Sequence, residues 1–119
     1  MPTLILLLIF LSVAMSAAAQ AFLKLGVGTV AIANPVATLV AMLMTPSIII
    51  GLSLYGAGAV AWLFVLQRTP LSLAYPFVAL GFVATAVIGV AMFGETLSFV
   101  RMAGIGLIIL GCVLVSQSA

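Results

Sequence analysis

Only four side chains in this 119-residue sequence carry a charge: Lys24, Arg68, Glu95 and Arg101. A single carboxylate cannot supply both a proton acceptor and a proton donor, and the chain has no histidine to replace either. The sequence contains no Cys–His or Ser–His pair and no phosphate-binding loop. We therefore expect no enzyme, no metal site and no cofactor. The net charge of +2 is too small and too dispersed to predict nucleic-acid binding.

Three polar residues, Ser16, Gln20 and Lys24, recur at intervals of four within the first apolar run. Each step of four turns a helix by about 400°, so the three drift by only about 80° and share one face. A polar stripe of this kind is unfavourable against lipid. Two interpretations stay open. In the first, Ser16 and Gln20 form hydrogen bonds to neighbouring helices and the Lys24 side chain extends to the membrane–water interface. In the second, all three side chains line a water-filled cavity.

Arg101 is predicted to lie in the first turn of a helix that Ser98 caps. A cation there opposes the helix dipole by about 0.3–1 kcal/mol, so we expect an anion nearby. That anion is either Glu95, across the preceding hairpin, or the phosphate of a lipid or substrate. Tyr75 precedes Pro76, which should kink or unwind its helix. The tyrosine is either an interface anchor or part of a cavity wall.

The elements that hold these side chains must be membrane helices. Of all residues 67% are hydrophobic and 3% are charged, whereas a soluble domain needs about a quarter charged. The apolar runs are continuous rather than alternating, which argues against a β-barrel. We expect an all-α membrane protein with one four-helix transmembrane domain over residues 1–119. The predicted spans are about 3–23, 47–66, 71–93 and 99–115.

Two further features concern how these helices are connected and packed. Asn34 can cap a helix and Pro35 suits its first turn, so a short interfacial helix is predicted at about 36–44, between the first and second spans. Gly104 and Gly111 lie seven residues apart on one face of the fourth span. Small residues allow helices to approach closely, and we expect this face to form a contact between subunits.

Three stretches carry a recognisable pattern: Ala61–Pro76, Phe93–Ser98 and Gly104–Val113. The most specific part is the combination of Ala-Tyr-Pro at 74–76 with Gly-Glu-Thr-Leu at 94–97. This pattern resembles the EamA-type half repeat of the drug/metabolite transporter superfamily. The resemblance covers nearly the whole chain.

Two four-helix groups of that superfamily are relevant. Small multidrug-resistance exporters carry a membrane glutamate on the first helix, eight residues before a lysine. Here Lys24 is present but the corresponding position is Ser16, so the resemblance does not imply drug/proton antiport. The chain is more similar to the ArnE/ArnF-like flippase subunits, through Ser16-x-x-x-Gln20-x-x-x-Lys24, Leu66-Gln67 and Ala74-Tyr75-Pro76. It departs from them in the long apolar connection between the first two spans.

The resemblance implies a flippase that moves a sugar linked to undecaprenyl phosphate across the bacterial inner membrane. The residues expected to bind such a substrate are Lys24, Arg101, Gln20, Ser16, Tyr75, Arg68 and Glu95. With four spans, Lys24 and Arg101 lie on one membrane side and Arg68 on the other. The expected partners are membrane lipids and a second subunit, either an antiparallel copy of the chain or a sister subunit. The alternatives are a small-solute or drug exporter and a non-transporting membrane partner.

Overall fold

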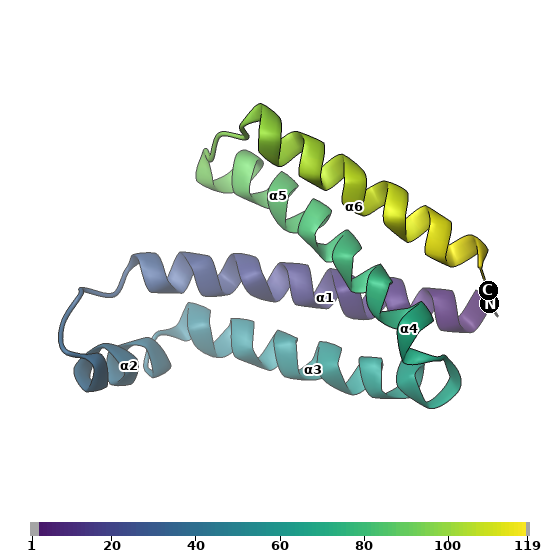
Figure 1. Cartoon of the computed structure of the whole chain (residues 1–119). Coiled ribbons are helices and arrows are strands. Elements are labelled where there is room, and N and C mark those ends of the chain that lie inside the picture. Colours follow the sequence, from purple (N-terminus) through teal and green to yellow (C-terminus); the bar gives the residue numbers. More distant parts are fainter. Residues whose placement is uncertain (1–2, 119) are drawn as a thin grey trace.

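The computed structural model describes residues 3–118, and within that range the chain is helical with no β-strand. Its elements are α1 (Thr3–Gly28), α2 (Pro35–Leu43), α3 (Pro46–Arg68), α4 (Leu71–Ala74), the 3₁₀ helix η1 (Tyr75–Ala79), α5 (Leu80–Phe93) and α6 (Phe99–Gln117) (Figure 1). The segment α4–η1–α5 forms one rod, so four helices are long and apolar enough to cross a membrane. The predicted all-α fold and the short helix after the first span are confirmed.

The observed boundaries differ from the predicted ones mainly at helix ends. Helix α1 continues to Gly28 instead of ending near residue 23, because no proline and no capping side chain interrupts it there. The rod of α4, η1 and α5 departs from α-helical geometry at Pro76, as predicted, because proline has no N–H to donate. Helix α2 begins as expected: the Asn34 side chain accepts a hydrogen bond from the Ala37 N–H at 2.8 Å.

Helices α1 and α3 form the most closely packed pair in the structure. Buried residues on α1 recur every seven positions, at Ile5, Ser12, Ala19 and Gly26. Buried residues on α3 recur at the same interval, at Gly51, Gly58 and Val65. Except for Ile5 and Val65 at one end, these residues are small, which lets the two antiparallel backbones approach closely. The Ser12 hydroxyl also donates a buried hydrogen bond of 2.8 Å to the Gly58 carbonyl. We call this contact the α1–α3 seam.

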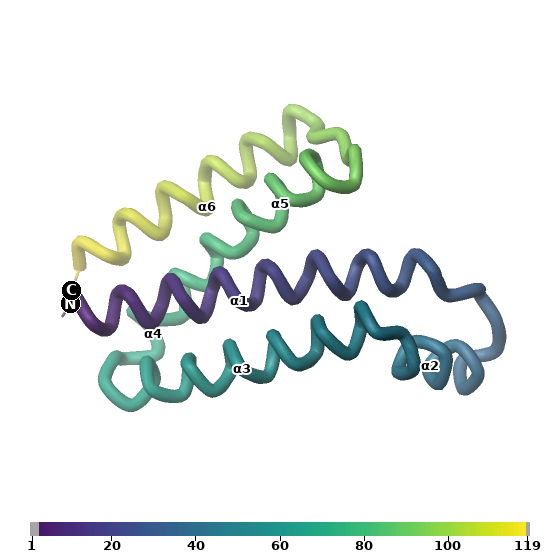
Figure 2. The backbone as a smooth tube through the Cα atoms, turned by 180° about the vertical axis from the view of Figure 1, so that it is seen from behind, coloured from purple at the N-terminus to yellow at the C-terminus, as the bar shows by residue number. Residues whose placement is uncertain are grey.

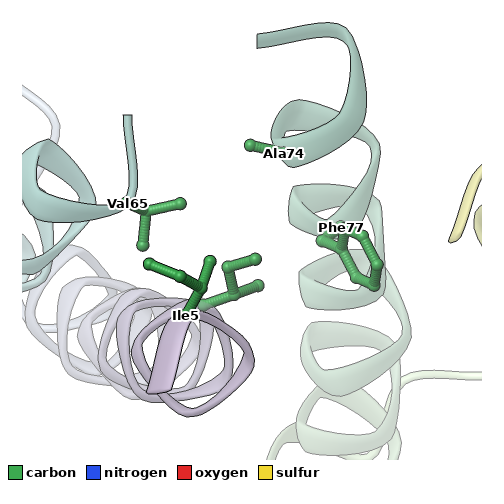
Figure 3. Packing of buried hydrophobic residues seen from close by; sticks show 5 residues of the cluster. Ile5, Val65, Ala74 and Phe77 are labelled. Atoms are coloured by element: carbon green, nitrogen blue, oxygen red, sulfur yellow. The ribbon is translucent and has the colours of Figure 1, made fainter. Parts of the chain in front are cut away.

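A cluster of apolar side chains joins this pair to the start of the α4–η1–α5 rod at one end of the bundle, which we call the Thr3 end. It contains Ile5, Ile9, Val65, Ala74 and Phe77 (Figure 3). Ala74 belongs to α4 and Phe77 to η1, so the cluster holds the start of the third rod against α1 and α3. The C-terminal ends of α3 and α6, which are Arg68 and Gln117, lie at the Thr3 end as well (Figure 2).

Away from this cluster the two helix pairs diverge. Both views show α5 and α6 separating from α1 and α3 toward the opposite end, which holds Gly28 and the α5–α6 hairpin (Figures 1 and 2). We call it the hairpin end. The buried residues of α5 and α6 are limited to Gly89 and Cys112. The fold is therefore closed at the Thr3 end and open at the hairpin end.

Candidate functional site

A cleft of about 670 Å³ lies between the diverging helix pairs and extends to the hairpin end. Its polar lining consists of Ser16, Gln20, Lys24, Tyr55, Thr85, Glu95 and Arg101. Three of the four charged side chains of the protein therefore face one cleft. The remaining lining is apolar and comes from α1, η1, α5, the hairpin after α5 and the start of α6.

The α1 wall of the cleft carries the polar stripe that the sequence predicted. Ser12 lies in the α1–α3 seam, and each further step of four residues turns about 40° away from it. Ser16 is accordingly half-buried, while Gln20 and Lys24 are exposed to the cleft. The seam therefore fixes the orientation of α1, and that orientation directs the stripe into the cleft.

Helix α5 supplies most of the opposite wall, and the hairpin between α5 and α6 and the start of α6 complete it. Gly94 has a positive φ of 65°, which ends α5, and the N–H groups of Gly94 and Glu95 both point to the Gly89 carbonyl. As predicted, Ser98 caps α6 by accepting a hydrogen bond of 3.1 Å from the Arg101 N–H. This cap places Arg101 in the first turn of α6, where it lines the cleft together with Glu95.

Glu95 and Arg101 line the same cleft, but within residues 3–118 no hydrogen bond joins their side chains. Lys24 likewise forms no side-chain hydrogen bond with a described residue. The three charged groups face the cleft and remain available to other ligands. Two cations and one carboxylate give the mouth of the cleft a net charge of +1.

A second cavity of about 210 Å³ continues the cleft toward the Thr3 end. The residues that line both hollows are Ser16, Tyr55, Val78 and Gly81. Tyr75 and Trp62 line the second cavity, and Tyr75 also borders a shallow depression at the surface near Pro76. The hollows therefore adjoin one another from the hairpin end to the surface around Tyr75.

The structure separates other predicted residues from this cleft. Arg68 ends α3 at the Thr3 end and is exposed, and it lines none of the three hollows described. Gly104 and Gly111 have open space around them, because a Cβ added at either would meet no described atom within 4 Å. Helix α6 is attached within the chain at Cys112, whose thiol donates to the Pro76 carbonyl at 2.8 Å.

Tyr55 is a cleft residue that is not among the predicted substrate-binding residues; from the sequence, Tyr55 and Trp62 are either interface anchors or part of a cavity wall. Tyr55 lies on α3 and borders both hollows, opposite the stripe of α1. Its spacing of seven residues from Trp62 places both aromatic rings on one face of α3 and is the only signal that marks it in the sequence. That spacing alone is equally typical of two side chains packed against lipid.

Comparison with known proteins identifies the family. The profile of the Small Multidrug Resistance protein family matches residues 41–108, which is more than half of the chain. The chain belongs to this family. The match runs from α2 through α3 and α5 into α6, and it leaves the polar stripe of α1 outside.

Individual relatives are more specific. The chain is 36% identical over 72 residues to the probable 4-amino-4-deoxy-L-arabinose-phosphoundecaprenol flippase subunit ArnE of Proteus mirabilis, covering 60% of this chain and 64% of the relative. It is 36% identical over 72 residues to ArnE of Aeromonas hydrophila, with 60% and 63% covered. It is 39% identical over 72 residues to the probable flippase subunit ArnF of Proteus mirabilis, covering 59% of this chain and 54% of the relative.

The matched regions thus span just under two thirds of the two ArnE relatives and about half of the ArnF relative. No solved structure matches the chain significantly. These relatives confirm the resemblance to ArnE and ArnF that the sequence predicts. The chain is a multi-pass membrane protein with bacterial flippase subunits among its relatives.

Proposed function

We propose that the chain is a subunit of a flippase that moves a polyprenyl-phosphate-linked sugar across the bacterial inner membrane. Lys24 and Arg101 hold the phosphate at the hairpin end, and Ser16, Gln20 and Tyr75 contact the head group inside the bundle. The proposal rests on one observation above all. Lys24 and Arg101 both line a single cleft that runs from the hairpin end into the apolar helix bundle.

The electrostatics of the cleft suit a phosphodiester. A phosphate that links a sugar to a polyprenol carries one negative charge, which matches the net charge of +1 at the cleft mouth. Arg101 can donate two parallel hydrogen bonds to phosphate oxygens, and the free N–H groups of the first turn of α6 favour an anion at the same place. A bound phosphate also offsets the unfavourable interaction of Arg101 with the helix dipole.

The adjoining hollows provide the path for the head group. Beyond Gln20 it meets Ser16 and Tyr55, and then Tyr75 near the Thr3 end. The lipid tails stay outside, against the exposed apolar side chains of α5 and α6. Arg68 is the basic side chain at the Thr3 end, and we assign it the anion contact on that side of the membrane.

The partner in this proposal is a second subunit, either an antiparallel copy of this chain or a sister subunit. The relatives are described as flippase subunits, which supports an assembly of more than one chain. Gly104 and Gly111 lie on a surface of α6 that no described residue covers, and small residues there permit close approach of another helix. Basic residues number two at the hairpin end and one at the Thr3 end, so the charge bias on orientation is weak.

A second candidate function follows from family membership, since the matching family is named for multidrug resistance. An exporter of organic cations needs an anionic site, whereas this cleft carries one carboxylate and two cations. The balance of charge therefore favours an anionic substrate over a cationic drug.

The test is reconstitution of the chain, alone and with a sister subunit, in liposomes that contain a polyprenyl phosphate linked to an aminopentose. Flipping is followed by the exposure of the sugar diol to impermeant periodate, and a hydrophobic organic cation is assayed in parallel. We expect Lys24→Ala to lower the flipping rate on the order of tenfold, because a charge-assisted contact to phosphate is lost. Lys24→Arg should retain most of the activity.

Ser53→Ala is the matched control, since the Ser53 hydroxyl donates to the Ile49 carbonyl within its own helix and lines none of the three hollows described. Flipping by Lys24→Ala at the wild-type rate would remove the assigned role of the lysine. Transport of the organic cation without any lipid flipping would establish the exporter instead.

A further inference from the structure

The only acidic side chain of the protein, Glu95, lies in the cleft that also holds Lys24 and Arg101. A site that bound phosphate alone would be better served without a carboxylate, because the phosphate and the carboxylate would repel each other within the same cleft. The position of Glu95 therefore needs a reason beyond phosphate binding.

The backbone of the hairpin holds Glu95 in a defined place. The Glu95 N–H donates to the Gly89 carbonyl at 3.1 Å, and the left-handed Gly94 makes this turn possible. The carboxylate then folds back onto α5 at Gly89. A Cβ built on Gly89 would lie 2.5 Å from Glu95 Oε1 and 3.1 Å from Glu95 Cδ. The carboxylate thus occupies the space that any larger residue at position 89 would fill.

The Glu95 carboxylate has no hydrogen bond to another side chain within residues 3–118, although both cations line the same cleft. The cleft consequently presents two separate kinds of ligand, a pair of cations and one anion. Such an arrangement is complementary to a zwitterion that carries an anionic group and a cationic group on the same small head.

We infer that Glu95 binds the protonated amine of a zwitterionic head group, with Gly89 as the positioning residue that lets the carboxylate lie against α5. Glu95 is then the specificity-determining residue that separates amino-sugar phosphates from sugar phosphates without an amine. This inference rests on the proposed flippase function and adds to it the chemical class of the head group. The relatives' printed substrate, an amino sugar on phosphoundecaprenol, belongs to the same class.

The two roles that Glu95 could have predict effects of opposite sign. If the carboxylate binds an amine, Glu95→Gln weakens the binding of the amino-sugar lipid. It strengthens the binding of a lipid whose amine is capped, because the carboxylate no longer repels the phosphate. If the carboxylate only supports the hairpin, Glu95→Gln lowers the activity toward both lipids in the same proportion.

The experiment compares two lipids, a polyprenyl-phosphate aminopentose and the same lipid with its amine acetylated. Both keep the diol that periodate cleaves, so one assay measures both flipping rates. We expect wild-type protein to prefer the free amine on the order of tenfold, and Glu95→Gln to abolish that preference.

Gly89→Ala keeps the carboxylate but displaces it, and it should lose the preference in the same way. Gly56→Ala is its control, because a Cβ at Gly56 meets no atom within 4 Å, and it should behave as wild type. The inference is overturned if Glu95→Gln keeps the preference, or if wild type flips both lipids equally; in either case the proposed flippase function stands. If wild type flips neither lipid, the proposed function itself fails, and the inference with it.

Discussion

The α1–α3 seam predicts that glycines within one helix differ sharply in how they tolerate a methyl group. Helix α3 contains three glycines, Gly51, Gly56 and Gly58. A Cβ at Gly51 would lie 2.9 Å from two Leu23 carbons and 3.1 Å from the Ala19 carbonyl oxygen. At Gly58 the nearest atoms are at 3.4 Å, and at Gly56 there are none within 4 Å. Alanine at these positions forms a graded series.

The size of each effect follows from two opposing terms. Replacing glycine by alanine in a helix interior favours the helix by up to about 1 kcal/mol. Overpacking at a close contact costs about 1–3 kcal/mol. At Gly51 the Leu23 side chain can rotate, but the Ala19 backbone can move away only if α1 moves. We therefore expect Gly51→Ala to destabilise by about 1–2 kcal/mol, Gly58→Ala to be near neutral and Gly56→Ala to be neutral or stabilising.

The measurement is equilibrium unfolding in mixed micelles at increasing fractions of a denaturing detergent. The single tryptophan, Trp62, reports it by fluorescence because it packs against the apolar cluster at the Thr3 end. A difference of about 1.4 kcal/mol between variants is a tenfold change in the unfolding constant. The seam would be disproved if Gly51→Ala were as stable as Gly56→Ala, because the two helices could not then be in backbone contact at position 51.

Two polar contacts give further predictions for the same unfolding assay. Ser12→Ala removes the buried hydrogen bond to the Gly58 carbonyl. It should lower the free energy of unfolding by about 0.6 kcal/mol, the average for interhelical hydrogen bonds in membranes. Ser116→Ala is the control and should have no effect, because the Ser116 hydroxyl bonds only within α6. Cys112→Ala removes the thiol donor to the Pro76 carbonyl. Because a thiol is a weaker donor than a hydroxyl, we expect a destabilisation of no more than about 0.6 kcal/mol, whereas Cys112→Ser keeps a donor and should not destabilise. Equal stability of the alanine and serine variants at position 112 would exclude a role for the hydrogen bond.

The sequence predicts the fold well because the relevant signals are local. Four apolar runs separated by Asn34-Pro35, Thr69-Pro70 and Gly94–Ser98 are sufficient to count the helices and to place their ends within a few residues. The helix caps of Asn34 and Ser98 form as predicted. Helix pairing is different. Helix α3 carries small residues on several faces, so composition does not show that Gly51 and Gly58 are the pair that meets α1.

The candidate site is predictable only in its separate parts. The spacing of Ser16, Gln20 and Lys24 places them on one face, and Ser98 fixes Arg101 in the first turn of α6. That these two groups line one cleft depends on the angle between the helix pairs, which no local pattern encodes. The contact of Glu95 with Gly89 is equally hidden, because it arises from a turn whose geometry is set by the left-handed Gly94.

The cleft exists because packing within the chain is concentrated at one end. At the Thr3 end the apolar cluster joins α1, α3, α4 and η1, and the thiol of Cys112 ties α6 to the same segment. At the hairpin end α5 buries only Gly89, and the residue that covers it is the charged Glu95 rather than an apolar side chain of α1. Apolar side chains in that place would draw the helix pairs together and close the cleft. A carboxylate there keeps the space polar, so the residue that we assign to substrate selection also accounts for why the cleft stays open.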